Sequence, residues 1–515
     1  FTFDNPQTLE MKVALSATRT ESALRNLHAE TDCCDFEQLL AETQSKWNKE
    51  LSILQAEGTE DQKAMLYTSL YHTMINPSIY MDVDGQYRGL DHNIHQAEGF
   101  TNYTVFSLWD TYRALHPLFN VLQPQRNADM VQSMLKHSEQ SVHGLLPVWS
   151  HMGNDNWCMI GYHAVSVLSD AYAKDVVRHC EEERRSNPDE KAMLNAMQRS
   201  STCPYYVNLD DYQQLGYVPF DKNNGCVSIT LEYAYDDWAI YQAALKAGNQ
   251  EMANIYKQRA ANWRNTFDTE LGFARPKMSD GTWKAPFSLF DTEGEGFVEG
   301  NSWVYSFYVP QDVKGLMEAM GGDAQFIHNL DTLFVMQLPP EFFENTEDVT
   351  EEGLMGCYNH GNEPAHHIAY LYNWTSQPYK TQYWLREIMN RFYKNNIDGL
   401  CGNDDCGQMS AWYIFSAMGF YPVCPGSDQY VFGAPYLPYL KVRLGNGKTL
   451  EIKAPNVSNE NRYVQKVTLN GQEITKLYLT HEQLMQGGEL VFEMDSKPNV
   501  KRGLKPEDKP YSLSE

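Results

Sequence analysis

The chain has 515 residues, and its 67 acidic side chains outnumber its 41 basic ones, which gives a formal net charge of −26. This charge repels phosphate backbones and excludes nucleic acid as a partner, whereas abundant carboxylates favour a divalent cation. The apolar runs are too short to span a bilayer, so we expect no membrane partner. The length is typical of two or three domains, or of one large domain with satellites.

Residues 2–18 alternate between apolar and polar side chains, the pattern of a half-buried strand. We expect residues 1–30 to be the tail of an N-terminal β domain and a linker. From Asp35 the apolar period becomes helical, and Thr59 and Glu60 form a helix start. Further helices are expected near 111–122, 127–140, 157–174, 189–199, 230–246, 249–267, 312–320, 324–334, 364–373, 379–394 and 407–418.

About a dozen helices without a fixed-length repeat favour a toroid of six helical hairpins over residues 31–425. After Gly419 the sequence alternates again, with Asn-Gly and Gly-Gly turns between the runs. This pattern predicts a C-terminal β domain over residues 426–515. The ten cysteines match neither a disulfide scaffold nor a zinc ribbon, so we expect buried or free thiols.

Two segments supply candidate catalytic carboxyls. Glu299 lies among apolar residues in FVEGNSWVY, a setting that raises the pKa of a carboxyl toward that of a general acid. In the structural alternative Glu299 is a helix-capping residue. Asp404 and Asp405, in the Gly-bracketed loop GNDDCG, provide a general base and a neighbour that tunes it, unless both only cap the next helix.

A third segment, YNHGNEPAHH, predicts a metal site. The adjacent histidines His366 and His367 face different ways on a helix, which argues against zinc. The amide and carboxylate of Asn362 and Glu363 form instead a hard-oxygen site suited to calcium. In SLWDTYRALHP, Trp109 is a candidate floor for a sugar ring and Asp110 a candidate partner of its hydroxyls, with a core tryptophan and a helix cap as the alternatives.

The segments SLWDTYRALHP, EGNSWVY, GNEPAHH and GNDDCGQMSAWYIFSAMGFYP together resemble the α-mannosidases of glycoside hydrolase family 92 over about residues 30–500. The resemblance implies an (α/α)6 domain with β-sandwich parts, and a calcium ion that binds the 2- and 3-hydroxyls of a terminal mannose. It implies Glu299 as general acid and Asp405 as general base, with Asp404 or Asn403 assisting, and Asn362 and Glu363 in the metal region. Glu363 is the alternative acid. The remaining residues expected to contact the substrate are Trp109, Asp110, Asn301, Trp303 and His360.

The predicted activity is therefore calcium-dependent, inverting hydrolysis of terminal α-linked mannose from a glycan, outside the cytoplasm. The family's N-terminal β-sandwich is nearly all missing from the sequence, so we expect it as a further partner. Two alternatives remain: another toroid glycosidase or phosphorylase, and a calcium-dependent glycan-binding fragment without turnover. The acidic GNDD loop argues against a phosphorylase, which needs no second base.

Overall fold

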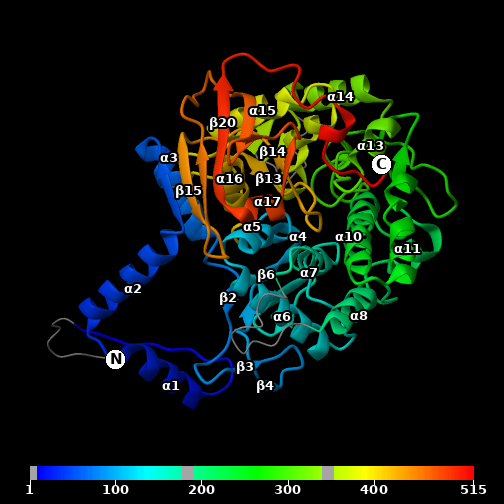
Figure 1. Cartoon of the computed structure of the whole chain (residues 1–515). Coiled ribbons are helices and arrows are strands. Elements are labelled where there is room, and N and C mark those ends of the chain that lie inside the picture. Colours follow the sequence, from blue (N-terminus) through cyan, green and yellow to red (C-terminus); the bar gives the residue numbers. More distant parts are fainter. Residues whose placement is uncertain (1–8, 177–188, 339–352) are drawn as a thin grey trace.

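The computed structural model describes residues 9–176, 189–338 and 353–515, and the chain is mainly helical with a sheet-rich C-terminal region (Figure 1). The α-helices are α1 (Thr20–Thr31), α2 (Phe36–Leu51), α3 (Glu60–His72), α4 (Leu108–Thr111), α5 (Leu115–Leu122), α6 (Pro124–Gln140), α7 (Ala164–Ala173), α8 (Glu190–Ser200), α9 (Leu209–Leu215), α10 (Cys226–Lys246), α11 (Gln250–Arg259), α12 (Ser302–Tyr305), α13 (Val313–Ala319), α14 (Asp323–Val335), α15 (Tyr379–Phe392), α16 (Gln408–Met418) and α17 (His481–Gln486). Short 3₁₀ helices are η2 (Asn262–Thr266), η5 (Glu363–Ala365), η6 (Ile368–Trp374) and η7 (Pro506–Asp508).

The strands are short except in the C-terminal sheet. They are β1 (Leu54–Glu57), β2 (Ser78–Ile79), β3 (Gln86–Arg88), β4 (Ile94–Gln96), β5 (Tyr103–Thr104), β6 (Phe106–Ser107), β7 (Trp149–His151), β8 (Asn154–Asp155), β9 (Phe267–Asp268), β10 (Phe273–Ala274), β11 (Leu354–Met355), β12 (Tyr358–Asn359), β13 (Phe420–Tyr421), β14 (Gln429–Phe432), β15 (Tyr439–Arg443), β16 (Thr449–Lys453), β17 (Tyr463–Leu469), β18 (Gln472–Glu473), β19 (Tyr478–Thr480) and β20 (Gly488–Asp495).

Most helices expected from the apolar period are confirmed, although the one expected near 157–174 begins only at Ala164. Capping explains the start of α3. Thr59 accepts the N–H of Gln62, whose side chain returns a bond to the Thr59 N–H, so α3 begins with a capping box as its sequence indicates. The segment expected as a helix at 364–373 is tighter: Tyr370 N–H bonds His367 O at 3.0 Å, the i to i+3 spacing of a 3₁₀ helix.

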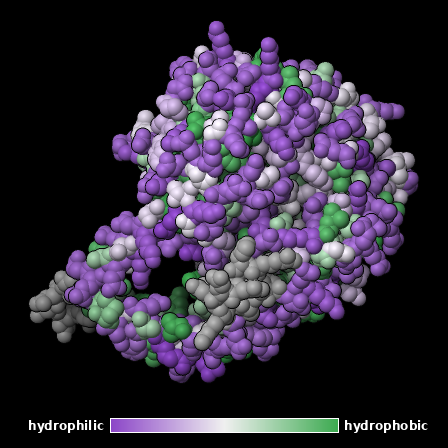
Figure 2. Space-filling view, in the orientation of Figure 1, coloured by the Kyte–Doolittle hydropathy of each residue, from purple (hydrophilic) through white to green (hydrophobic). Residues whose placement is uncertain are grey.

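The strand expected over residues 2–18 is wrong for its described part. Residues 9–18 form no strand, and Leu9, Met11, Val13 and Leu15 are 63–85% exposed. A strand needs a neighbour to take its backbone hydrogen bonds, and none of the described strands pairs with this segment. Instead α1 follows, and α1 and α2 extend from the body as an arm, with an opening between arm and body in Figure 2. Residues 2–8 lie outside the described part.

Helix α10 is the central buried helix of the body. It packs against α7, α8, α11 and η2, and Figure 1 shows it beside α11. On another side α16 packs against α3 and α5, and its residues are all buried. These contacts join helices that are distant in sequence into one hydrophobic core.

The C-terminal region contains a six-stranded sheet in the order β1-β15-β16-β20-β17-β18 and a three-stranded sheet β13-β14-β19. Strand β16 runs parallel to β20, while β17 and β20 are antiparallel. The alternating burial expected from the sequence is present in β15 and β16. However, the edge strand β1 comes from between α2 and α3, so the sheet is not made by residues 426–515 alone.

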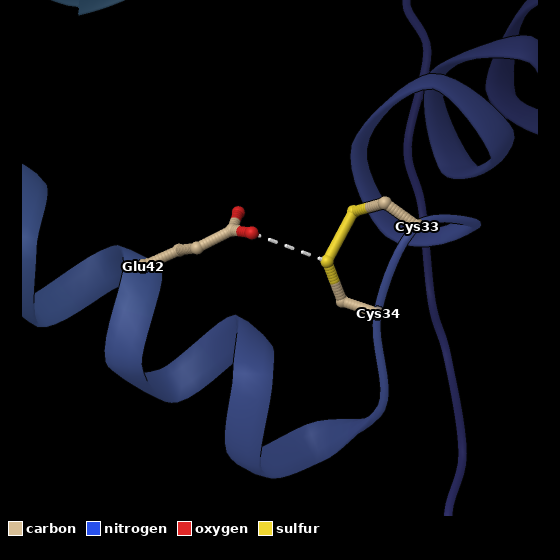
Figure 3. A group of neighbouring side chains, drawn as sticks. All are labelled: Cys33, Cys34 and Glu42. Atoms are coloured by element: carbon tan, nitrogen blue, oxygen red, sulfur yellow. Dashed lines mark hydrogen bonds between the residues drawn. A yellow bond between two sulfur atoms is a disulfide. The ribbon is translucent and has the colours of Figure 1, made fainter.

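The expectation that the cysteines are thiols is wrong for one pair. Cys33 and Cys34, on the turn between α1 and α2, form a disulfide, and the carboxylate of Glu42 lies 3.4 Å from Cys34 Sγ (Figure 3). Among the described cysteines Cys203, Cys226, Cys357 and Cys424 are buried thiols, as expected. Within the described ranges, no helix has the length and apolar character needed to cross a membrane.

Candidate active site

Two glycines bring the metal-site segment and the acidic loop together. A Cβ on Gly402 would lie 2.8 Å from the Cα of Gly361, and a Cβ on Gly361 would lie 3.0 Å from the carbonyl oxygen of Cys401. Only glycine permits this backbone contact. The close approach places Glu363, on η5, beside Asp405, in the loop before α16. These two glycines therefore pack against each other.

Three carboxyl groups converge at this point. Asp110, Glu363 and Asp405 each offer an oxygen atom, and these atoms lie within 4.8 Å of one another. Asp110 belongs to the short helix α4, so three distant segments supply the cluster. Asp110 Oδ1 and Glu363 Oε1 are buried and accept no hydrogen bond from any described residue. Such groups are costly to bury, which marks the cluster as a site that receives a proton or a cation.

The electrostatics of the cluster disfavour three negative charges. Burial raises the pKa of Glu363 well above its ordinary value, and the charges of Asp110 and Asp405 raise it further. Burial likewise raises the pKa of Asp110 well above its usual range, with a contribution from Asp405. Burial also raises the pKa of Asp405, but a hydrogen bond with Glu363 opposes that increase. Without a cation, protonated Glu363 is thus the donor that keeps Asp405 ionised.

Glu299 joins the same site through Asn362. The side-chain N–H of Asn362 donates to Glu299 Oε2 at 2.5 Å, and the charge of Glu299 contributes to the raised pKa of Asp110. Helix α12, which follows Glu299, packs against η5, which carries Glu363. Asn362 is predicted beside Glu363 as a metal ligand. Its side-chain nitrogen Nδ2 donates to Glu299, so its side-chain oxygen Oδ1 is the atom that it offers to a cation.

The two predicted catalytic residues have left-handed backbones. Glu299 has φ +52° and Asp405 φ +46°, and Cys406 and Gly407 continue at +56° and +95°. Non-glycine residues adopt this conformation rarely, and the surrounding structure must hold it. Strained backbone at both residues is typical of a functional site.

Asp404 and Asn403, the neighbours of Asp405 in the acidic loop, lie in different surroundings from Asp405. Asp404 Oδ1 accepts the N–H of Ser410 in the first turn of α16 at 2.9 Å, and Asp404 Oδ2 lies 3.7 Å from His72 Nδ1. Asp404 thus takes the helix-capping role weighed from the sequence, whereas Asp405 faces the carboxyl cluster. Asn403 is exposed and, with Asp404 and His72, lines a cavity of about 460 Å³.

The other predicted substrate contacts differ in exposure. Trp109 is buried, and its Nε1–H donates to Glu232 at 2.9 Å. Asn301 caps α12 by accepting the N–H of Val304. Trp303 is half-buried, and its Nε1–H has no partner among the described residues.

His360, also predicted as a substrate contact, lies in the core. It is fully buried, and its two ring nitrogens lie 2.8 Å from the hydroxyls of Tyr358 and Tyr393. Since both nitrogens already have protein partners, the structure gives His360 a packing position.

Sequence analysis missed Glu232, which lies fully buried on α10 and contacts residues beside the carboxyl cluster. A signal was present: Ser228, Glu232 and Asp236 recur at every fourth position of a mostly apolar segment, which places these polar groups on one buried face. Arg113, three residues after Asp110, is also buried, and its guanidinium lies over the rings of Trp109 and Tyr112.

The donor set of the cluster fits calcium. Asp110, Glu363 and Asp405 offer carboxylate oxygens only, which hard cations prefer. The nearby histidines His366 and His367 are unsuited to zinc, because His366 Nε2 and His367 Nε2 bond backbone carbonyls of His360 and Phe307. The unpaired buried oxygens of Asp110 and Glu363 are the free ligand atoms that such a site requires.

Comparison with known proteins defines the family. Residues 22–496 match the catalytic-domain model of glycosyl hydrolase family 92, so the chain belongs to this family. It is 44% identical to a family 92 α-mannosidase of Bacteroides thetaiotaomicron solved with mannoimidazole, with a TM-score of 0.91 over 96% of this chain and 64% of that chain. A family 92 inverting mannosidase of the same organism is 36% identical, with a TM-score of 0.88, over 97% and 68%.

A more distant relative is named an uncharacterized secreted glycosidase, from Arthroderma benhamiae. It is 24% identical over 99% of this chain and 63% of the relative. The chain thus spans less than two thirds of the length of this fungal relative and of the mannosidase solved with mannoimidazole.

Proposed function

We propose that the protein hydrolyses terminal α-linked mannose from glycans, with inversion and with calcium. The observation that carries this proposal is the meeting of Glu299, Asn362, Glu363, Asp110 and Asp405 at one site in a family 92 chain. The solved relatives named as α-mannosidase and inverting mannosidase support the substrate and the stereochemistry.

Glu299 acts as the general acid in this proposal. It is only half-buried, so its carboxyl reaches both solvent and the site, and the Asn362 N–H fixes Oε2 at 2.5 Å. A carboxyl held in this orientation donates its proton to the departing glycosidic oxygen. Glu363 is the alternative acid, since its pKa is raised well above normal by burial and by its acidic neighbours.

Asp405 acts as the general base. Its carboxyl comes from a different loop than Glu299, and burial raises its pKa, which makes it a stronger base than an exposed carboxylate. An ionised Asp405 removes a proton from a water that attacks the anomeric carbon from the face opposite the leaving group. Asp404 holds the start of α16 and so positions the loop.

Calcium would be held by Glu363 with Asp110 and Asp405, and with the carbonyl oxygen of Asn362 as a further ligand. When bound, it offsets the charge of the cluster and offers open positions to hydroxyls of the sugar. The proposed ligands are thus three carboxylates and an amide oxygen, where the sequence predicted an amide and one carboxylate.

The same proposal covers the architecture and the location of the protein. The packing of α10 with α7 and α11 and of α16 with α3 and α5 supports an (α/α)6 arrangement of the helices. A relative named as secreted supports a location outside the cytoplasm.

An assay on an aryl α-mannoside with and without a chelator tests the function. We expect turnover that the chelator abolishes and that added calcium restores. Binding of mannose without turnover would favour the glycan-binding alternative, and turnover of an aryl β-mannoside or α-glucoside in its place would refute the substrate.

A further inference from the structure

Helix α10 presents one polar face beneath the candidate active site. Ser228, Glu232 and Asp236 lie at successive fourth positions, and all three are fully buried. Buried ionisable residues are rare unless they are paired, so such a face in a core helix requires a reason. The partners of these three residues supply one.

Glu232 holds side chains from two short helices, α4 and α12, at once. Its Oε1 accepts the Nε1–H of Trp109 at 2.9 Å and lies 3.2 Å from the hydroxyl of Tyr305. Trp109 directly precedes Asp110 of the carboxyl cluster. The Tyr305 hydroxyl has one proton, and it shares that proton in a three-centre hydrogen bond between Glu232 Oε1 and the carbonyl oxygen of Val298, 3.0 Å away. Val298 directly precedes Glu299.

Ser228 completes the connection to the second loop. Its hydroxyl oxygen accepts the N–H of Val298 at 3.0 Å, so both backbone polar groups of Val298 are held by or through α10. The next residue, Glu299, has φ +52°, a conformation that costs energy unless neighbouring contacts impose it. The bonds at Val298 are contacts of this kind.

The charge of Glu232 is balanced within the core. His163 lies between Glu232 Oε2 and Asp236 Oδ1, at 2.8 Å from each. Burial alone would lower the pKa of His163, but the two carboxylates raise it to about 9, so the ring is protonated at neutral pH and donates to both. The Arg113 guanidinium, over the Trp109 ring, supplies the second positive charge. Two carboxylates and two cations thus form a neutral, rigid cluster.

We propose that Glu232 is a positioning residue that sets the loop of Asp110 and the loop of Glu299 at their working separation, through Trp109 on one side and Tyr305 on the other. The link to catalysis rests on the proposed function, whereas the link to loop order does not. Residues that orient the groups in contact with a ligand typically contribute 10- to 100-fold in activity.

The test compares Glu232→Gln with Asp237→Asn. Both oxygens of Glu232 accept hydrogen bonds, whereas a glutamine replaces one of them by an NH2 donor. That NH2 group faces either protonated His163 or the N–H of Trp109 and the O–H of Tyr305, which are donors too. One of the two hydrogen-bonded links of Glu232 is therefore lost, while the shape of the side chain is kept. Asp237 lies five residues after Glu232 on the same helix, is equally buried, and pairs at 2.9 Å with Arg259. Loss of Asp237 therefore tests a buried charge that holds neither loop.

Amide hydrogen exchange of the two loops is the first readout. We expect exchange at residues 296–300 and 107–111 to quicken by about tenfold or more in Glu232→Gln and to stay at the wild-type rate in Asp237→Asn, at a temperature where both are folded. Unchanged exchange in Glu232→Gln, or equal increases in both variants, would overturn the proposal. Hydrogen exchange tests the positioning role even if the wild-type protein hydrolyses no mannoside. That outcome would refute the proposed function but not the positioning role.

Kinetics on an aryl α-mannoside are the second readout. We expect kcat to fall by about 10- to 100-fold in Glu232→Gln with little change in KM, and to stay near wild type in Asp237→Asn. If Glu232→Gln does not fold, Tyr305→Phe removes only the hydroxyl that joins Glu232 to Val298, and it should quicken exchange at 296–300 but not at 107–111. Wild-type kcat in an active preparation of Glu232→Gln or of Tyr305→Phe would contradict the positioning role.

Discussion

Calcium should stabilise the folded protein measurably, because only the folded state brings Asp110, Glu363 and Asp405 together. A ligand at 100 times its dissociation constant adds about 2.7 kcal/mol to the free energy of unfolding. A chain of 515 residues unfolds with an entropy of about 1.1 kcal/mol/K near 60 °C. Saturating calcium should therefore raise Tm by about 2.5 °C, as measured by calorimetry after chelation and calcium addition.

The variant Glu363→Gln isolates the site. It should reduce the calcium shift to less than about 1 °C at the same concentration, since it replaces a carboxylate ligand by an amide. It should also raise Tm in the absence of calcium, because the amide N–H donates to Asp405 as protonated Glu363 does, without the need to bind a proton at neutral pH.

Asp398→Asn is the matched control, since this exposed acid lies in the neighbouring loop and outside the cluster. Its calcium shift should equal that of the wild type. The reasoning is refuted by a wild-type Tm that does not respond to calcium, or by the same shift in wild type and Glu363→Gln.

Three further outcomes are expected. Glu299→Gln should slow substrates with poor leaving groups by about 100- to 10⁴-fold and activated aryl mannosides far less, while equal losses would identify Glu363 as the acid. The first product seen by NMR of the anomeric proton should be β-mannose, with Glu299 and Asp405 carboxyls about 6.5 to 9.5 Å apart, and initial α-mannose would contradict the base assignment. Stability should fall as pH drops from about 6.5 to about 4, because burial lowers the pKa of His137 and His367 to about 4, so unfolding takes up protons. In urea titrations at pH 7, 6 and 5, His137→Gln should reduce this slope by about 1 kcal/mol per pH unit averaged over the range, and an unchanged slope would refute it.

Local patterns in the sequence were sufficient for most helices and for the strands of the C-terminal sheets. The capping box at Thr59 and the apolar period after it act over a few residues, so they can be recognised without the fold. The alternation at residues 2–18 is equally local, yet no strand forms over 9–18, because strand formation also depends on a partner elsewhere in the chain. The same dependence explains why β1 was not expected to join a sheet formed mainly by residues far along the chain.

The candidate site divides in a similar way. The residue types and their motifs singled out Glu299, Glu363 and Asp405, and the family resemblance, confirmed by the match over residues 22–496, gave them roles. The sequence left open whether Asp404 and Asp405 cap α16 or act in chemistry. The structure separates them, since Asp404 binds the Ser410 N–H and Asp405 turns toward Glu363.

The sequence by itself thus determined the family, the helical body, the sheet-rich end and the acidic segments from which a site is built. Tertiary structure decided which carboxyls share that site. Glu363 and Asp405 meet because Gly361 and Gly402 let two distant loops touch, and Asp110 joins them from α4. Glu232 of α10 contacts Trp109 on α4 and Tyr305 on α12, on two sides of the site. Hydrogen bonds and charge interactions act over a few ångströms in space, so contacts between distant segments have no local signature in the chain.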